Sequence, residues 1–259
     1  VMEYIVKLPH HIIGVVETHL DQKKTDKAIK DLKACKWIPA AAAARPSKTS
    51  ERGNHGGVVL AHKKWLQMSI PAEAEGAGGC NMPNPDVIHK YIRVRGKTIA
   101  IIFVYFDNTI ALQGENLNKL SKIEEIRDGG RTPIIAIGDY NMKAAEWSND
   151  TLNRMELTIL QTEANITCRT TAEKGGSAID YALVSTSIAP LIKNINTVGG
   201  EDGHKVPWSP HLGIELELHA HVDTEWTREQ VKPKPIPIEK DDKGIDKQWS
   251  VGKDEWQKL

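Results

Sequence analysis

The sequence predicts an α/β protein in which short buried strands alternate with amphipathic helices. Residues 134–137 are an unbroken apolar run, which is typical of a strand buried on both faces. Residues 21–37 and 115–127 carry apolar side chains at helical spacing. The chain has 259 residues, of which 40% are hydrophobic and 26% charged, and this is enough for one large domain with a substantial core. In such layered domains, functional groups gather where strands end.

Composition narrows the classes of partner. Lys plus Arg number 34, and so do Asp plus Glu. The chain therefore has no overall positive charge of the kind that indicates a nucleic-acid binder, although this balance is compatible with a local basic groove. The three cysteines are odd in number, far apart and without zinc spacing, which indicates reduced thiols and an intracellular protein, with the nucleus as one candidate compartment. No apolar run reaches transmembrane length. We expect a monomer without a membrane partner.

The first strand is predicted over residues 12–16, and it delivers Glu17 at its end. A carboxylate at the end of a buried strand is a candidate metal ligand, and its ordinary alternative is a solvated strand end. The helix over 21–37 follows, with its lysines facing outward.

The next part of the chain alternates loops with one short strand. Residues 39–54 are rich in Ala, Ser and Arg and predict a loop, and residues 56–60 predict a second core strand. The Gly- and Pro-rich run 71–85 predicts another loop, of a length that is often functional. We expect His55 and His62 at the surface.

A hairpin is predicted where residues 91–94 and 99–105 flank Arg95-Gly96-Lys97. Its second arm ends at Tyr105, whose hydroxyl is a candidate phosphate contact; the alternative is a ring that packs while its tip meets water. The helix over 115–127 follows, and two glycines end it.

The apolar run 134–137 leads directly into Gly138-Asp139-Tyr140-Asn141. Residues i and i+2 of an extended chain point to the same side, so Asp139 and Asn141 are expected to project together from the strand end. A carboxylate beside a carboxamide can contact a phosphate, a divalent metal and an attacking water. The alternative is an Asx turn that only caps the strand.

Further strands are predicted toward the C-terminus. A helix or helical turn is expected over 147–161 and a strand over 166–170. Residues 177–185 predict a strand that carries Asp180 in its middle. Asp is depleted in strand interiors, and a carboxylate held there needs a charged or hydrogen-bonded partner.

The last strand is predicted over residues 212–218, where apolar and polar residues alternate strictly. His211 lies at its start, a position at which a lone histidine is usually structural. Beyond it the composition changes. We therefore expect one domain over residues 1–222 and a Pro- and Lys-rich charged tail over 223–259.

Together these motifs resemble the endonuclease/exonuclease/phosphatase superfamily, which includes exonuclease III-like apurinic-site endonucleases and retroelement endonucleases. The resemblance covers roughly residues 5 to 220. It implies a four-layer α/β sandwich, in which two packed mixed β-sheets are flanked by helices. It rests on these stretches in this order: Glu17-Thr18 after an apolar strand, Gly138-Asp139-Tyr140-Asn141, Ser177-Ala178-Ile179-Asp180-Tyr181 with Val184-Ser185, and Ser209-Pro210-His211.

The resemblance also implies roles for the residues around the metal and the water. Glu17 would hold Mg²⁺ or Mn²⁺, a hard ion that prefers oxygen ligands. Asp139 would orient or deprotonate the attacking water. Asp180 would support the site and is a candidate ligand of a second metal.

The remaining roles concern the scissile phosphate. Asn141 and His211 would bind it, and His211 would stabilise the charge that develops as the phosphodiester breaks. Tyr105 would contact the phosphate or the leaving group, with Asn108 nearby. The implied chemistry is metal-assisted hydrolysis, with nucleic acid, DNA first, as the substrate.

The chain departs from the family pattern at two places. The family's first strand carries an Asn that has no counterpart here, because the chain begins after that strand by the resemblance; residues 1–6 are a candidate substitute. The family's final motif is Ser-Asp-His, and Pro210 replaces the Asp. We expect that Asp to pair with the histidine, so its loss predicts weak catalysis unless another acid, such as Glu201 or Asp202, takes its place.

Three functions therefore compete. The uninterrupted Gly-Asp-Tyr-Asn and Ile-Asp-Tyr motifs favour a Mg²⁺-dependent nuclease. The neutral net charge keeps open a phosphatase or lipid phosphodiesterase of the same fold. Pro210 and the missing first strand favour a catalytically weakened scaffold that binds nucleic acid or protein.

Overall fold

The computed structural model describes residues 9–47, 53–69, 84–108, 110–163, 166–169, 176–198 and 210–219. The chain divides into two units, Val1–Thr224 and Glu225–Leu259, and every described residue belongs to the first. The expected tail, most of the expected loop over 71–85, and the candidate substitute for the first strand lie outside the described residues. Within the described part of the chain, no helix is long and apolar enough to cross a membrane.

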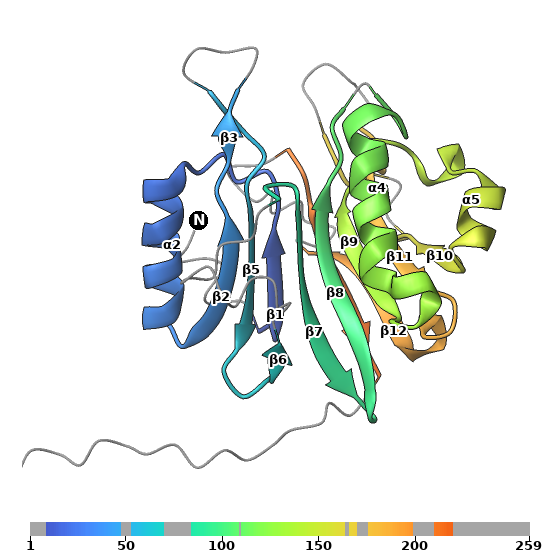
Figure 1. Ribbon diagram of the computed structural model, residues 1–259, viewed down its shortest axis with the longest axis horizontal. Coiled ribbons are helices and arrows are strands. Elements are labelled where there is room, and N and C mark those ends of the chain that lie inside the picture. Colours follow the sequence, from blue (N-terminus) through green and yellow to red (C-terminus); the bar gives the residue numbers. More distant parts are fainter. Residues whose placement is uncertain are drawn as a thin grey trace, which may run out of the picture. The chain divides into compact units, whose positions relative to one another are not determined.

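The described residues form helices and strands in an α/β arrangement (Figure 1). The α-helices are α2 (Gln22–Ala34), α4 (Gly114–Arg127) and α5 (Asn149–Arg154). The strands are β1 (Ile12–Val15), β2 (Trp37–Ala42), β3 (Arg45–Pro46), β4 (Asn54–His55), β5 (Val58–Lys63), β6 (Met68–Ser69), β7 (Val87–Val94), β8 (Lys97–Tyr105), β9 (Ile134–Asp139), β10 (Leu157–Leu160), β11 (Asp180–Ser185), β12 (Ile192–Val198) and β13 (Gly213–Leu218).

The larger sheet has six strands in the order β10-β11-β9-β8-β7-β6. Its β8–β9 pair is parallel and the other pairs are antiparallel, so the expected mixed character is confirmed for this sheet. Helix α4 makes the crossover that a parallel β8–β9 pair requires. A second sheet has the order β1-β5-β2 with antiparallel pairings. The described residues also form two separate two-stranded pairs, the short β3–β4 and the longer β12–β13.

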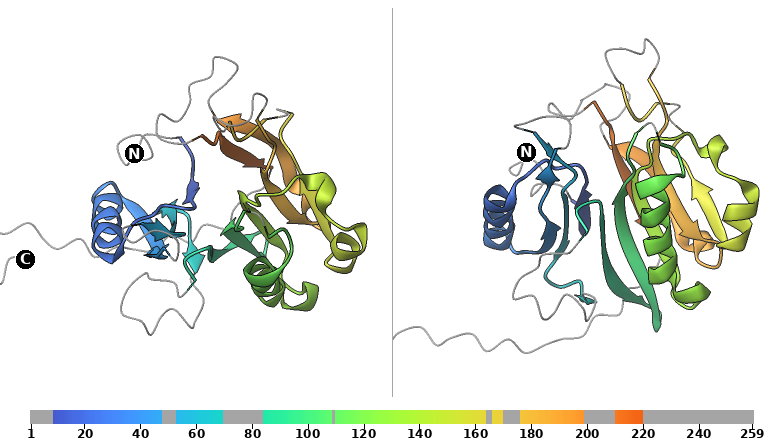
Figure 2. Two further views of the ribbon diagram at one scale, coloured as in Figure 1. Left: turned by 90° about the horizontal axis from the view of Figure 1, so that it is seen from above. Right: turned by 45° about the horizontal axis from the view of Figure 1, so that its top comes forward.

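The sheets and helices bury apolar side chains at three levels. Helix α2 packs Leu32 on the three-stranded sheet, against Trp37 and Val59. The opposite face of that sheet meets β7 and β8, where Leu60 lies in one cluster with Ile88. Helix α4 covers the far face of the six-stranded sheet, with Leu120, Ile123 and Ile126 in the largest core cluster. Figure 2 shows α2 on one side and α4 with α5 on the other.

The helix expected over 21–37 is shorter than predicted. It ends at Ala34, because Lys36 takes a left-handed φ of 64° that a helix cannot continue through. Trp37 then opens β2, and the expectation of a loop over 39–54 is wrong for residues 39–42, for β3 and for the first residue of β4. Pro39 is accepted in this strand because β2 lies at the edge of its sheet, where a missing N–H is tolerated.

Other expectations need smaller corrections. The helix expected over 147–161 is only the short α5, and β10 follows it. Asp180 is the first residue of β11 rather than its middle. His62 is buried, with 1% of its surface exposed, not at the surface. The hairpin at 95–97, the helix α4 and the strand β13 are confirmed.

Candidate active site

Strand register brings three candidate residues into one row across the six-stranded sheet. Tyr105 is the last residue of β8 and pairs with Asp139, the last residue of β9. Asp139 pairs on its other side with Asp180, the first residue of β11. The row lies at the end of the sheet where β8 and β9 finish, so three separate motifs reach one place.

The Gly-Asp-Tyr-Asn motif divides its side chains between the site and the core. Tyr140 is buried, stacks on Tyr181 with ring centroids 4.4 Å apart, and donates a hydrogen bond to the Ala136 carbonyl oxygen at 2.9 Å. Asp139 turns toward the site from the end of β9, on the opposite side from Tyr140. Asn141 does not reach the site by the expected strand alternation, because β9 ends at Asp139 and Asn141 takes a left-handed φ of 49°. Tyr140 and Tyr181, each next to one of the two aspartates in the chain, thus pack together in the core beneath the site.

Asn141 folds back on Asp139, as in an Asx turn. Its backbone N–H donates to Asp139 Oδ1 at 2.9 Å, and its side-chain amide lies 3.3 Å from Asp139 Oδ2 and 2.7 Å from the carbonyl oxygen of Phe106. The Asx-turn alternative therefore describes the backbone correctly. It also places the carboxylate and the carboxamide together, as the site hypothesis requires.

Asp180 is held by contacts on both of its oxygens. The Thr167 hydroxyl donates to Oδ2 at 2.7 Å, and His211 Nδ1 lies 3.0 Å from both Oδ1 and Oδ2. On the other side of the imidazole, Nε2 lies 3.7 Å from Asp139 Oδ2 and 3.4 Å from Cys168 Sγ. His211 therefore bridges the two aspartates.

This arrangement bears on the departure from the family pattern at Pro210. We expected weak catalysis from the missing Asp unless another acid, such as Glu201 or Asp202, takes its place beside His211. The partner is Asp180, which comes from β11, while Glu201 and Asp202 lie outside the described residues. His211 thus has a carboxylate partner despite the proline.

Burial and crowding shift the pKa values of the bridge. Burial, and then the charge of Asp180, raise the pKa of Asp139 to about 7, while the charge of His211 opposes the rise. Burial disfavours the charged form of His211, but the hydrogen bond and charge of Asp180, with the charge of Asp139, raise its pKa to about 9. The site therefore favours a protonated imidazole between carboxylates.

Glu17 and Tyr105 lie within electrostatic reach of this cluster. Glu17 follows β1 with a left-handed φ of 52°, and its charge acts on Asp139 and His211. Burial, together with the charge and hydrogen bond of Glu17, raises the pKa of Tyr105. Asn108 is exposed in the turn that follows β8, and no contact places it at the cluster.

The donor set is suited to a hard divalent ion. Asp139, Asp180 and His211 offer ligand atoms that all lie within 4.8 Å of one another. Glu17 is not a member of this group. Mg²⁺ prefers carboxylate, water and phosphate oxygens, so Asp139 with the nearby Glu17 fits better than the imidazole. The buried, crowded carboxylate of Asp139 is also a place where added positive charge is favourable.

Some site residues carried no signal in the sequence. Thr167 and Cys168 belong to a stretch that we expected only to be a strand, and the structure gives Cys168 isolated bridges to Ser177 and His211. A threonine hydroxyl that supports a carboxylate has no fixed spacing from it, so only the fold reveals the pair.

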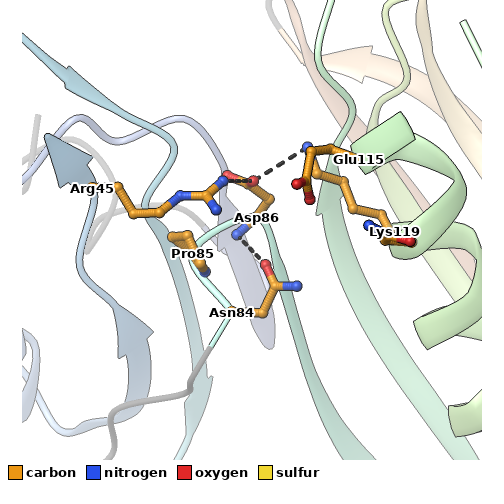
Figure 3. A pocket seen from close by; sticks show the side chains of 7 residues that line it. Arg45, Asn84, Pro85, Asp86, Glu115 and Lys119 are labelled. Carbon is orange, nitrogen blue, oxygen red and sulfur yellow. Dashed lines mark hydrogen bonds and ion pairs between the residues drawn. The ribbon is translucent and has the colours of Figure 1, made fainter. Parts of the chain in front are cut away.

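A second polar cluster, also missed, lies beside Tyr105. Lys119 contacts Asp107 at 2.9 Å and Asp86 at 3.2 Å, and His55 Nε2 lies 2.7 Å from Asp107. Figure 3 shows the neighbouring pocket, which has a volume of about 230 Å³. Its lining residues are Arg45, Asn84, Pro85, Asp86, Glu115, Asn118 and Lys119.

Comparison with known proteins identifies the family of the chain. The model of the Endonuclease/Exonuclease/phosphatase family matches residues 1–201. No curated protein matches the chain.

Several solved structures share the fold. A variant of the 3′ phosphatase NExo from Neisseria, bound to a product DNA hairpin, has a TM-score of 0.55 and 17% identity, over 86% of this chain and 92% of that one. An AP endonuclease from Archaeoglobus fulgidus has a TM-score of 0.54 and 16% identity, over 84% and 92%. The mannosyl-6-phosphatase Bt3783 from Bacteroides thetaiotaomicron has a TM-score of 0.52 and 15% identity, over 84% and 88%.

Proposed function

Because the chain belongs to the Endonuclease/Exonuclease/phosphatase family, we propose that it is a Mg²⁺-dependent phosphodiester hydrolase that cleaves DNA as an endonuclease or exonuclease. The observation that carries the proposal is the bridge at the strand ends, where His211 lies 3.0 Å from Asp180 and 3.7 Å from Asp139. A protonated imidazole held by two carboxylates, beside an amide and a phenol, is a set of donors and acceptors matched to a phosphate diester.

We assign separate roles at the metal and the attacking water to three carboxylates. Glu17 and Asp139 would hold Mg²⁺ or Mn²⁺, which when bound supplies positive charge against the phosphate oxygens. Asp139 also orients the attacking water and accepts its proton. Both oxygens of Asp180 face His211, so we assign it to orienting that residue before any role at a second metal.

The remaining side chains are assigned to hydrogen bonds with the scissile phosphate. His211 donates from Nε2 to a phosphate oxygen and stabilises the charge that grows as the bond breaks. Asn141 keeps its amide hydrogen bond to the Phe106 carbonyl oxygen and donates to the same phosphate the hydrogen that otherwise faces Asp139 Oδ2 at 3.3 Å. Tyr105 contacts the phosphate or the leaving oxygen, with Asn108 nearby on the exposed turn.

DNA is proposed as the substrate because two proteins of the same fold are described as acting on it or binding it: the Neisseria 3′ phosphatase with its product DNA hairpin and the AP endonuclease. An origin in a retroelement belongs to the same proposal. A second candidate is a phosphatase or lipid phosphodiesterase, which the balance of 34 basic and 34 acidic residues and the mannosyl-6-phosphatase of the same fold favour. A weakened binding scaffold is the third.

Several wider features belong to the same proposal. We propose a domain with the four-layer α/β sandwich fold that extends to about residue 222, followed by a charged tail over 223–259. The protein works as an intracellular monomer, with the nucleus as a candidate compartment.

The experiment that tests the proposal is a cleavage assay with labelled single-stranded, duplex, abasic-site and 3′-phosphorylated DNA, with Mg²⁺ and with chelator. We expect chelator-sensitive cutting of at least one DNA, and the ranking of substrates identifies the kind of nuclease. A folded protein that cuts none of them but hydrolyses sugar phosphates or phosphoinositides would support the second candidate. A folded protein without any of these activities would support the scaffold.

A further inference from the structure

An ion-pair network lies directly behind Tyr105, outside the bridge described above. We call it the Lys119 network; its members are Lys119, Asp86, Asp107, His55 and Arg45. Lys119 Nζ contacts Asp86 Oδ2 at 3.2 Å and Asp107 Oδ2 at 2.9 Å. His55 continues the network from Asp107 at 2.7 Å, and Arg45 continues it from Asp86 at 2.7 Å, the latter contact being drawn in Figure 3.

The Lys119 network contacts Tyr105 on several sides. Lys119 Nζ lies 5.4 Å from the centroid of the Tyr105 ring, within the range of a cation–π contact. The His55 ring meets the same phenol edge-on, with centroids 5.7 Å apart. The Tyr105 backbone N–H donates to the Asp86 carbonyl oxygen at 2.9 Å. The ring and the backbone of Tyr105 are thus both held by members of one network.

Helix α4 anchors this network to the turn that follows Tyr105. Asn116, which is fully buried, accepts from the Asp107 backbone N–H at 2.7 Å and donates to the carbonyl oxygens of Asp107 and Ala111 at 2.8 and 2.7 Å. Lys119 lies one turn later on the same helix. The position of α4 therefore determines where the end of β8 lies.

Stability alone does not account for these contacts. The side chain of Lys119 is only 3% exposed, and taking an ammonium and its carboxylates out of water has a desolvation cost that the pairing often only balances. Asp86 Oδ1 is also buried and has no hydrogen-bond partner among the described residues, which is a further cost. A pair of well-packed apolar side chains would hold α4 on β8 at least as firmly.

We propose that Lys119 is a positioning residue for Tyr105: its ammonium, held between Asp86 and Asp107, fixes the phenol so that the hydroxyl meets the phosphodiester. Lys119 touches no reacting atom in this account and acts only through the tyrosine. The inference rests on the proposed function, because it assigns Tyr105 to the phosphate.

A double-mutant cycle tests the coupling. Lys119→Met removes the charge and keeps the length of the side chain, and Tyr105→Phe keeps the ring but removes the hydroxyl. We expect Lys119→Met to lower kcat between about 10- and 100-fold with little change in KM, because small misplacements of catalytic groups cost this much. In the Tyr105→Phe background, the same change should lower kcat less than about threefold.

Lys122→Met is the matched control, since Lys122 lies on the same helix and pairs with the exposed Glu125; its kcat should equal that of the wild type. Equal losses from Lys119→Met with and without the Tyr105 hydroxyl would overturn the proposal, and so would no loss at all. If Lys119→Met does not fold, Asp107→Asn takes its place in the cycle, because it weakens the hold on Lys119 and keeps the ammonium.

A second measurement separates this inference from the proposed function. In protein labelled with ¹³C in its tyrosine rings, Tyr105→Phe identifies the Tyr105 signal. We expect Lys119→Met to shift and broaden that signal and to leave those of Tyr140 and Tyr181 in place. An unchanged Tyr105 signal would overturn the positioning, whether or not the protein cleaves DNA. If Lys119→Met shifts the Tyr105 signal but the wild-type protein cleaves no DNA, the proposed function and the catalytic role are overturned and the contact is kept.

Discussion

His211 Nδ1 lies 3.0 Å from both carboxylate oxygens of Asp180, although the residue beside the histidine in the chain is a proline. The contact joins β11 to a residue two positions before β13, and the Thr167 hydroxyl donates to Asp180 Oδ2 at 2.7 Å. Such a contact sets the orientation of the ring and favours its charged form. It allows a catalytic histidine in a chain whose final motif lacks the acidic residue.

Asp180→Asn should lower kcat/KM between about 10²- and 10⁴-fold, because an amide keeps the shape of the partner but neither attracts the imidazolium nor accepts on both sides. Steady-state cleavage of the best DNA substrate measures the loss. Asp150→Asn, an exposed carboxylate on α5, is the matched control and should keep the wild-type rate. A rate within threefold of the wild type for Asp180→Asn would separate His211 from the chemistry.

Pro210→Asp should raise the cleavage rate less than about threefold. Since Asp180 already occupies Nδ1 of His211, a second carboxylate at the exposed position 210 has no orienting task left to perform. The same cleavage assay measures the effect. A gain of tenfold or more would mean that the histidine lacks an effective partner in the natural sequence.

Gly138→Ala should destabilise the domain by about 3 kcal/mol, at the upper end of the usual cost of overpacking. A Cβ at this position would lie 1.9 Å from the backbone carbonyl oxygen of Val104, and a backbone oxygen between paired strands cannot move aside. Denaturant unfolding gives the free energy. Gly96→Asn is the control, because a Cβ there meets nothing within 4 Å and asparagine tolerates the positive φ. Equal stabilities of the two variants would contradict the packing that we describe at β8–β9.

His62 should make the domain sensitive to acid. Burial, and then the charge of Lys90, lower its pKa to about 4, and its buried Nε2 has no hydrogen-bond partner among the described residues. The unfolded chain takes up a proton as pH falls through 6.5 while the folded chain does not, so the stability due to His62 is complete above pH 6.5 and is lost toward pH 4.

The variant His62→Gln cannot take up this proton. Its free energy of unfolding should therefore fall less than that of the wild type between about pH 7 and pH 4.5, by up to about 2 kcal/mol. Denaturant titrations at several pH values measure the difference. Parallel curves for the two proteins would contradict the burial of a neutral imidazole.

The parts of the fold that the sequence predicted are those with strong local patterns. The apolar run at β9, the helical spacing of α4 and the strict alternation in β13 each leave a periodic signal, and each was confirmed. The strand β2 was missed because Pro39 and the alanines that follow are typical of a loop. Only pairing with β5 makes a strand of them, and such pairing lies outside any local window.

The site was predictable as a set of residues, but not as a set of contacts. Asp139, Asp180 and Tyr105 could each be placed on a strand from the sequence, whereas the register that puts them in one row depends on the sheet. The partner of His211 could not be placed from the sequence, because Asp180 is far from it in the chain and only the fold brings the two side chains together. Lys119 was missed because a lysine on a helix is ordinarily solvated, and its burial appears only when α4 packs.

The measurement that tests the central claim most directly is DNA cleavage by the wild type and by Asp139→Asn, with Mg²⁺ and with chelator, alongside the Tm of each protein. We predict that Mg²⁺-dependent cleavage by the wild type is abolished in the variant. Its Tm should be unchanged or higher at about pH 8, since burial and the charge of Asp180 disfavour the carboxylate form of Asp139 in the folded chain. Cleavage by a folded Asp139→Asn variant at the wild-type rate would contradict the assignment of this site.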